Sequence, residues 1–317
     1  KIEFRQHTEW FNQNISGIYQ IHYDLQSKDS QGITDPEFLQ NVDNFVQMFR
    51  DVPEVKHVNS ITDTFKRLNK NMHGDNPAYY KLPGKRDLAA QYLLLYEMSL
   101  PYGLDLNDQI NVDKSSTRVI VTIADISTST FIRLGDMGTE WLKTNTPEYM
   151  HTEGTSPTLM FSHITEDNLR AMFWGTLLAF FLITLVMIVA LKSVKYGLIS
   201  LIPNIIPAGI AVGIWSLTMG KVGFAISVVG SVTLGIIVDD TVHFLTKYVR
   251  AKREKGLTPA EAIRDSFENV ASALIATSAI LILGLGVMMF SAFKMNWVLG
   301  TLSAITIAIA LLIDFTL

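Results

Sequence analysis

The sequence predicts an α+β soluble domain at residues 1–165, followed by an all-α polytopic membrane domain at residues 166–317. The first half alternates short strand-like and helix-like patterns, whereas the second half contains five long apolar segments. The charges divide at the same place: the first half holds 15 Lys and Arg against 21 Asp and Glu, and the second holds 11 against 9. Such asymmetry is typical of a water-exposed domain joined to a membrane domain.

The soluble half reads as two successive β-α-β units, which is the element order of a ferredoxin-like domain. Its first strand alternates apolar side chains, and Thr34-Asp35-Pro36-Glu37 then begins an amphipathic helix. Residues 68–114 are less regular and include a region read as an insertion or loop. The expected strands are 19–25, 55–61, 117–126 and 149–154, and the expected helices are 36–49, 85–98 and 128–145.

The five apolar segments of the second half are each close to the ~20 residues that a membrane-spanning helix needs. Most helices of a soluble protein keep one polar face toward water. These five successive segments have no polar face, so they are not read as helices of a soluble core. The expected spans are 171–191, 196–219, 222–247, 270–290 and 297–317.

The basic residues between the spans predict the orientation of the chain, because short cytoplasmic loops are enriched in Lys and Arg. Lys192 and Lys195 follow the first span, and residues 247–255 carry five basic side chains after the third. The opposite side offers Lys221 and Lys294. We therefore expect residues 1–165 outside the cytoplasm and a cytoplasmic loop at about 248–268, where Thr258-Pro259-Ala260-Glu261 forms a capping box that begins a helix.

Two adjacent acids, Asp239 and Asp240, lie inside the apolar third span. One charged side chain at the bilayer centre costs ~2.5–3.5 kcal/mol on insertion scales, so such a pair usually marks an ion or proton path. The two side chains lie about 100° apart on a helix, and His243 falls between them one turn on. Two carboxylates this close in a poorly hydrated site cannot both ionise at low cost, so the pair is expected to bind a proton reversibly, with His243 as a relay or a partner.

Small and polar residues on neighbouring spans predict close helix packing, with polar members lining the same buried path. Asp314 has no adjacent acid in the sequence, so it is expected to contribute less than the pair. The expected lining residues are Thr277, Ser278 and Asp314, and the expected packing residues are Gly235, Gly209 and Gly213.

Three motifs of the membrane half resemble those of the resistance–nodulation–division (RND) superfamily. They are Gly235-Ile-Ile-Val-Asp239-Asp240-Thr-Val-His-Phe with the basic loop that follows, Leu201-Ile-Pro203-Asn204, and Leu-Leu-Ile-Asp314. Within this superfamily the chain resembles the hydrophobe/amphiphile exporters of the MMPL type. It is similar to the C-terminal half of such an exporter without the leading helix of that half.

The resemblance implies a porter-like domain outside the cytoplasm, periplasmic in a bacterial inner membrane, and export of hydrophobic or amphiphilic molecules, including lipids, driven by the proton-motive force. It places Asp239 and Asp240 in the proton-relay positions. It also implies that a second half or a further copy of the chain completes the transporter.

Other classes of protein fit the sequence less well. A sterol-sensing or receptor-like lipid-binding module and a Sec-type export accessory subunit stay open as alternatives, although a sensor does not need titratable groups at membrane depth. An intramembrane aspartyl protease places its two aspartates on two helices, so we expect no enzyme. The chain has no Cys and no further His near Asp239 and His243, so we expect no metal or cofactor. The acidic soluble half argues against nucleic acid.

Overall fold

The computed structural model describes residues 3–101, 105–219 and 224–316. The chain divides into two compact units, Lys1–Glu166 and Asp167–Leu317. The predicted position of Lys221, the start of the third predicted span and the end of the fifth lie outside the described residues.

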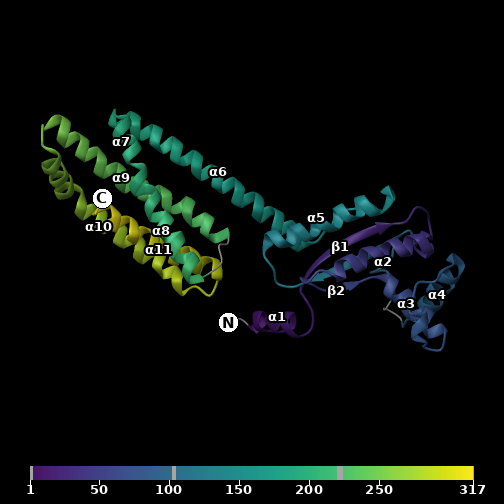
Figure 1. The fold of residues 1–317 in the computed structure, drawn as a ribbon. Coiled ribbons are helices and arrows are strands. Elements are labelled where there is room, and N and C mark those ends of the chain that lie inside the picture. Colours follow the sequence, from purple (N-terminus) through teal and green to yellow (C-terminus); the bar gives the residue numbers. More distant parts are fainter. Residues whose placement is uncertain (1–2, 102–104, 220–223, 317) are drawn as a thin grey trace. The chain divides into compact units, whose positions relative to one another are not determined.

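The first unit contains a three-stranded antiparallel sheet in the order β1-β3-β2 (Figure 1). Ile21, Tyr23 and Leu25 of β1 are fully buried, and the residues between them point to the other face. This alternation is that of a sheet with one covered face. The strands are β1 (Tyr19–Gln26), β2 (Val55–Asn59) and β3 (Ser116–Ile123).

The predicted fourth strand at 149–154 is wrong. The chain there forms the short 3-10 helix η3 (Glu148–Met150), and one isolated bridge pairs Thr155 with His22 of β1. The two residues exchange both backbone hydrogen bonds, each at 2.9 Å. Because Pro157 begins the next helix two residues later, the chain leaves the edge of β1 before a longer ladder can form.

Among the described residues of this unit, five α-helices accompany the sheet, and the sequence predicted three of them. Asp35 accepts hydrogen bonds from the backbone N–H of Glu37 and Phe38, which confirms the predicted helix start. The strand predicted to reach residue 61 is shorter, because Ser60 accepts from the Thr62 N–H and begins an unpredicted helix. The helices are α1 (Glu3–Asn14), α2 (Pro36–Arg50), α3 (Ile61–Met72), α4 (Arg86–Ser99) and α5 (Thr128–Asn145). Two further 3-10 helices are η1 (Gly32–Thr34) and η2 (Pro77–Tyr79).

An aromatic cluster forms the centre of this unit. The Tyr23 ring lies 5.0 Å from that of Phe45 and 5.6 Å from that of Phe49, both on α2. Its hydroxyl donates to the Gly135 carbonyl of α5 at 3.1 Å. Burial raises the pKa of the Tyr23 phenol, so this side chain remains a neutral hydrogen-bond donor. The single side chain therefore joins β1 to both α2 and α5.

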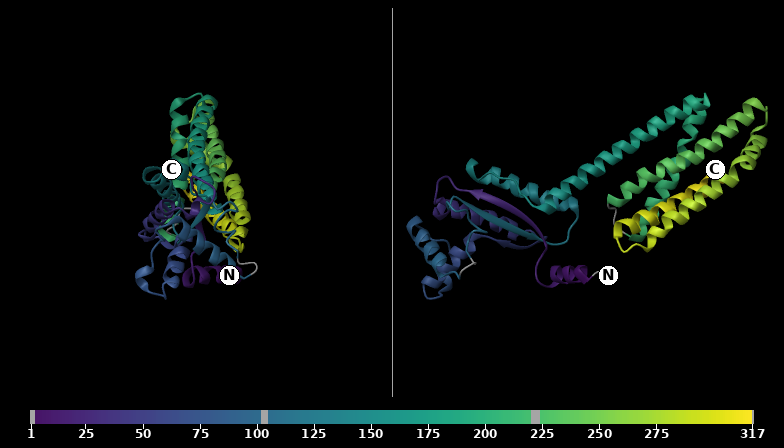
Figure 2. Two further views of the ribbon diagram at one scale, coloured as in Figure 1. Left: turned by 90° about the vertical axis from the view of Figure 1, so that its right-hand side faces the viewer. Right: turned by 180° about the vertical axis from the view of Figure 1, so that it is seen from behind.

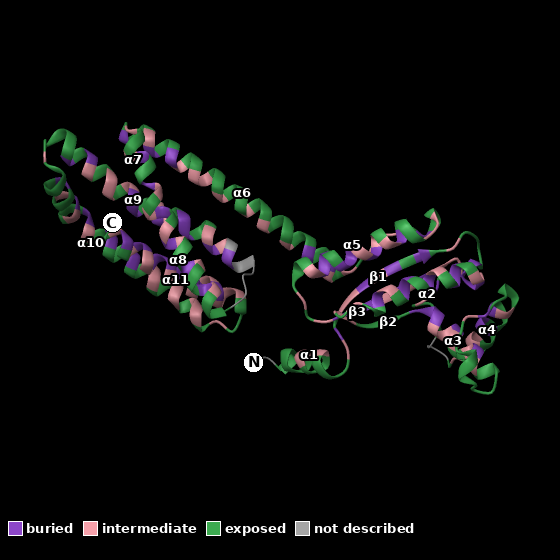
Figure 3. Ribbon diagram, viewed as in Figure 1, coloured by how far each residue is buried: buried purple, intermediate pink, exposed green. Residues whose placement is uncertain are grey.

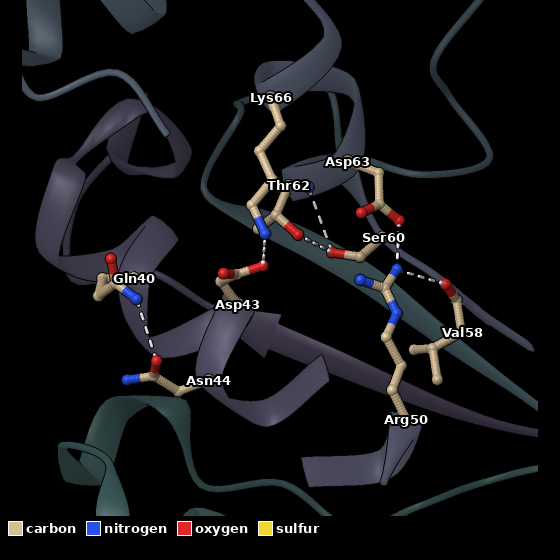
Figure 4. A network of polar contacts seen from close by, with 9 residues as sticks. All are labelled: Gln40, Asp43, Asn44, Arg50, Val58, Ser60, Thr62, Asp63 and Lys66. Atoms are coloured by element: carbon tan, nitrogen blue, oxygen red, sulfur yellow. Dashed lines mark hydrogen bonds and ion pairs between the residues drawn. The ribbon is translucent and has the colours of Figure 1, made fainter. Parts of the chain in front are cut away.

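A polar network joins α2 to α3 and β2 (Figure 4). Lys66 pairs with Asp43 at 2.5 Å, and both side chains are largely buried. Arg50 pairs with Asp63 at 2.5 Å and also donates to the Val58 carbonyl at 3.2 Å. These paired charges fix the position of α3 beside the sheet without leaving an unpaired ion at the boundary.

The second unit is a helical bundle. In the described part of the chain five helical segments are long and apolar enough to cross a membrane, the number that the sequence predicted. The central helix is α11, which contacts α8, α9 and α10; α10 and α11 run side by side in every view (Figure 2). Gly300 of α11 allows the close approach, because an added Cβ would lie 2.6 Å from the Leu285 carbonyl oxygen. The helices are α6 (Pro157–Leu191), α7 (Val194–Ile199), α8 (Leu201–Met219), α9 (Phe224–Glu254), α10 (Pro259–Gly286) and α11 (Lys294–Asp314), and η4 (Val287–Phe290) follows α10.

Helix α6 is mostly exposed along its length, as the colouring of Figure 3 shows. Near its C-terminal end Met187 and Leu191 are buried against Val249 of α9. Arg253 donates to the backbone carbonyls of Leu191 at 2.7 Å and Lys192 at 3.2 Å. These bonds satisfy carbonyls that the end of a helix leaves without an intrahelical partner.

The predicted capping box is confirmed at the start of α10. The Thr258 side chain accepts from the Glu261 N–H, and the Glu261 carboxylate accepts from the Thr258 N–H at 3.0 Å. Helix α10 therefore begins well before its apolar part.

Candidate functional site

The two adjacent acids of α9 face different surroundings. Asp240 is 8% exposed, whereas the Asp239 side chain is 72% exposed on the surface of the bundle. The helical angle of about 100° between neighbouring residues accounts for the divergence. The sequence predicted that angle but did not predict which acid faces inward.

Asp240 lies among polar side chains from two other helices. Ser278 of α10, which is 1% exposed, lies beside its carboxylate. Asp314 of α11 is close enough for the two carboxylates to interact electrostatically. Asp314 has no adjacent acid in the sequence, but the fold brings it near an acid of another helix. Its smaller contribution stays a prediction.

Asp240, which is buried, and Asp314, which is half-buried, form an acid pair without a strong basic partner. No Lys or Arg in the described ranges forms an ion pair with either carboxylate. The Oδ2 atom of Asp314 is buried and has no hydrogen-bond partner among the described residues. Two charges in such surroundings would repel each other and lose their hydration, so the arrangement is chemically suited to hold a proton.

Asp239 and His243 form a second pair on the exposed side of α9. His243 Nε2 lies 3.6 Å from Asp239 Oδ1, and the two side chains are 64% and 72% exposed. The structure therefore brings these two predicted residues together. They lie on a different side of α9 from the buried Asp240.

Several predicted neighbours lie away from this site. Thr277 is exposed, and its hydroxyl donates to the Ala273 carbonyl of its own helix at 2.9 Å. The prediction that three glycines pack helices together is not met within this chain, because a Cβ added to any of them would meet nothing within 4 Å. These glycines are Gly209, Gly213 and Gly235.

Sequence analysis missed a buried polar pair next to Asp240. The Thr241 hydroxyl donates to Asn204 Oδ1 of α8 at 2.9 Å, and both side chains are at most 4% exposed. The signal in the sequence was a lone Asn within an apolar span, since buried amides need partners. Together the buried polar residues come from α8, α9, α10 and α11.

The described residues contain no group of three or more His, Asp or Glu placed to hold a metal ion. What the site offers is carboxylate, hydroxyl and amide groups inside an apolar bundle. Such groups bind and release protons or form hydrogen bonds whose pattern changes with protonation.

Comparisons with known proteins agree with the fold of the helical bundle. The model of the MMPL family matches residues 4–317. A solved structure, the crystal structure of a heavy metal efflux pump, is similar with a TM-score of 0.55 at 14% identity. The match covers 95% of this chain and 33% of the pump, and at that identity it shows the fold alone. A search of curated proteins gave no match.

Proposed function

The chain belongs to the MMPL family, and from this premise we propose that the protein is a secondary transporter that exports hydrophobic or amphiphilic molecules, including lipids, at the expense of the proton-motive force. Membership of the MMPL family and the similarity of the fold to that of a heavy metal efflux pump support a multi-pass membrane transporter of the RND type. The observation that carries the finer proposal is the acid pair of buried Asp240 and half-buried Asp314 inside a bundle of apolar helices.

The proposed coupling follows from the placement of the acids on different helices. Protonation removes the repulsion between Asp240 and Asp314 and allows their carboxyl groups to approach, with Ser278 as a third hydrogen-bonding group. Loss of the proton restores the repulsion and separates the helices. Because α11 packs against α8, α9 and α10, a displacement at this point changes several helix contacts at once. Asp239 and His243 supply the outer part of the relay.

The donor set and the family support the proposed substrate class. The heavy-metal description belongs to the similar pump, and this chain has no Cys to offer soft metals a thiolate. A hydrophobic or amphiphilic substrate needs no such ligands. We place the soluble unit outside the cytoplasm in a bacterial inner membrane, where it would contribute to the substrate route.

The exposed Asp239–His243 pair indicates where a further part of the transporter would contact this bundle. A carboxylate and an imidazole at membrane depth are costly against lipid tails. We infer that a second half of the transporter, or another copy of the chain, covers this face of α9.

The test compares substitutions that keep side-chain shape and remove the titratable charge. Asp240→Asn and Asp239→Asn should each abolish energy-dependent efflux of the lipophilic dye Nile red from cells that make the full-length protein. The control Glu268→Gln alters an exposed acid that pairs with Arg264 and should leave efflux unchanged. Wild-type efflux by both Asp variants, at equal protein levels and with a protonophore-sensitive wild type, would refute the relay.

A further inference from the structure

A basic surface of the bundle lies where α6 ends and α7 begins, beside the last turns of α9. Lys252 of α9 donates to the Tyr196 hydroxyl of α7 at 3.3 Å, and Lys195 is close enough to interact electrostatically with the same hydroxyl. Arg253 donates to the backbone carbonyl of Lys192 at 3.2 Å, so a third lysine belongs to this surface. All three lysines are exposed, and together with the Tyr196 hydroxyl they are called the basic corner below.

The positive charge of the basic corner has no acidic partner in the described part of the chain. Two nearby basic side chains are paired, Arg250 with Glu254 and Lys255 with Asp265, each at 2.6 Å. No such ion pair involves the three lysines of the basic corner within the described ranges. Residues 168–238 of the sequence contain no Asp or Glu. A negatively charged group of another molecule can therefore approach these lysines without competition from a carboxylate.

An exposed apolar stripe on α6 leads to the basic corner. Its members follow the spacing i, i+3, i+4 and i+7, so they share one face of the helix and rise about 10 Å along its axis. They are Leu182, Leu185, Val186 and Val189, which are 48% to 68% exposed. The opposite face of α6 is the one that packs, because Met187 and Leu191 are buried against Val249 of α9.

The basic corner and the stripe are complementary to the two parts of a phospholipid. Lysine ammonium groups attract the phosphate of an anionic lipid, and the stripe offers apolar surface to an acyl chain that runs parallel to α6. A soluble anion would leave the stripe unused, and an apolar helix would leave the lysines unpaired. Because Lys and Arg cluster at this end of the spans, the lipid would come from the cytoplasmic leaflet, where anionic lipids are found.

We propose that the basic corner and the stripe of α6 form a binding site for one anionic phospholipid, with its phosphate between Lys195 of α7 and Lys252 of α9. This lipid is a resident component of the bundle and not the exported molecule, so the inference goes beyond the proposed function. Its phosphate joins α7 to α9 and adds to the contact that Arg253 makes with the end of α6.

The first test measures binding to the purified full-length protein in detergent by native mass spectrometry, which requires no transport. The probes are dioleoylphosphatidylglycerol and dioleoylphosphatidylethanolamine, which carry the same acyl chains and differ in net charge. One copy of the anionic lipid should bind about tenfold more tightly than the zwitterionic lipid. Equal binding of the two would overturn the proposal. So would equally tight binding of glycerol phosphate, because a soluble anion would then account for the site.

The second test removes charge from the basic corner. Each lysine near a membrane surface strengthens binding about fivefold, so Lys195→Gln with Lys252→Gln should weaken phosphatidylglycerol binding about thirtyfold. The control pair Arg264→Gln with Lys294→Gln also removes two positive charges and should bind like the wild type. Arg264 pairs with Glu268, and Lys294 begins α11. An equal loss in both pairs would indicate a general attraction of charge and would overturn the site.

The third test changes the stripe. Val186→Ser with Val189→Ser should weaken phosphatidylglycerol binding about fivefold, because the acyl chain loses apolar contacts. The control pair Val232→Ser with Val287→Ser changes valines that are 54% and 68% exposed elsewhere on the bundle, and its binding should match the wild type. Unchanged binding by the first pair would show that no acyl chain lies on α6 and would overturn the proposal.

These binding measurements are independent of the proposed function. Wild-type efflux by Asp240→Asn would refute the relay and would leave the lipid results as they are. Equal binding of the two lipids, together with an inactive Asp240→Asn, would overturn the lipid site and retain the relay.

Discussion

At the scale of single residues, the bond between Thr241 and Asn204 should matter more than the other threonine bonds in the bundle. Thr241→Val keeps the side-chain shape but leaves the buried Asn204 amide without its donor. Hydrogen bonds between membrane helices contribute roughly 0.6 kcal/mol on average, with a maximum near 1.7, and this fully buried bond should lie in the upper part of that range.

The matched control is Thr277→Val, because Thr277 is exposed and bonds to carbonyls of its own helix. Unfolding of the purified protein by a denaturing detergent should show a loss for the first variant and little change for the second. A larger loss for Thr277→Val would mean that α10 packs differently from the arrangement described here.

The same residues show what sequence reasoning could reach. The adjacent acids of α9 were visible because charge is rare in apolar spans. The partner of Asp240, however, is Asp314, and helical periodicity cannot say which of two acids 100° apart on one helix faces another helix far away in the sequence. Which acid faces inward depends on contacts between helices, and the local pattern of a single sequence does not reveal those contacts.

At the scale of elements, Gly138 of α5 should be the least replaceable residue of the sheet-covering helices. A Cβ at this position would lie 2.8 Å from the Phe49 ring and closer still to the Tyr23 hydroxyl, both of which are fully buried. Gly138→Ala should cost ~1–3 kcal/mol, the usual penalty for overpacking a core.

Gly84 is the corresponding control, since a Cβ there would meet nothing within 4 Å. Hydrogen exchange measured by mass spectrometry should rise in the peptides of β1 and α5 for Gly138→Ala and should stay unchanged for Gly84→Ala. Unchanged exchange in both variants would contradict the close approach of α5 to β1.

Elements with strong local signals were predicted well, and elements decided by packing were not. Asp35 and Thr258 are N-cap residues whose side chains predicted the start of a helix, and both starts were confirmed. Residues 149–154 were predicted to be a strand, but a strand forms only where its backbone has a hydrogen-bonded neighbour for several residues. Here the chain turns into α6 after a single bridged pair.

At the scale of the whole molecule, the two units should have opposite accessibility across the membrane. Ser30→Cys and Asn107→Cys, both exposed in the first unit, should react with a membrane-impermeant maleimide in intact spheroplasts. Arg264→Cys, exposed at the beginning of α10, should react after lysis and not before. The basic bias of the connections on one side supplies the physical reason. The reverse pattern would invert the proposed topology.

The short connection between α9 and α10 determines where a protease can cut. Helix α9 ends at Glu254 and α10 begins at Pro259, so four residues between them are outside a helix, and Gly256 has a positive φ of 66°. A protease needs an unfolded segment, and the basic residues that flank this connection lie within helices. Trypsin added to inverted vesicles should therefore cut first after Lys255, as peptide mass spectrometry would show. Because α9 and α10 pack against each other within the bundle, the two fragments should stay together in the membrane after the cut.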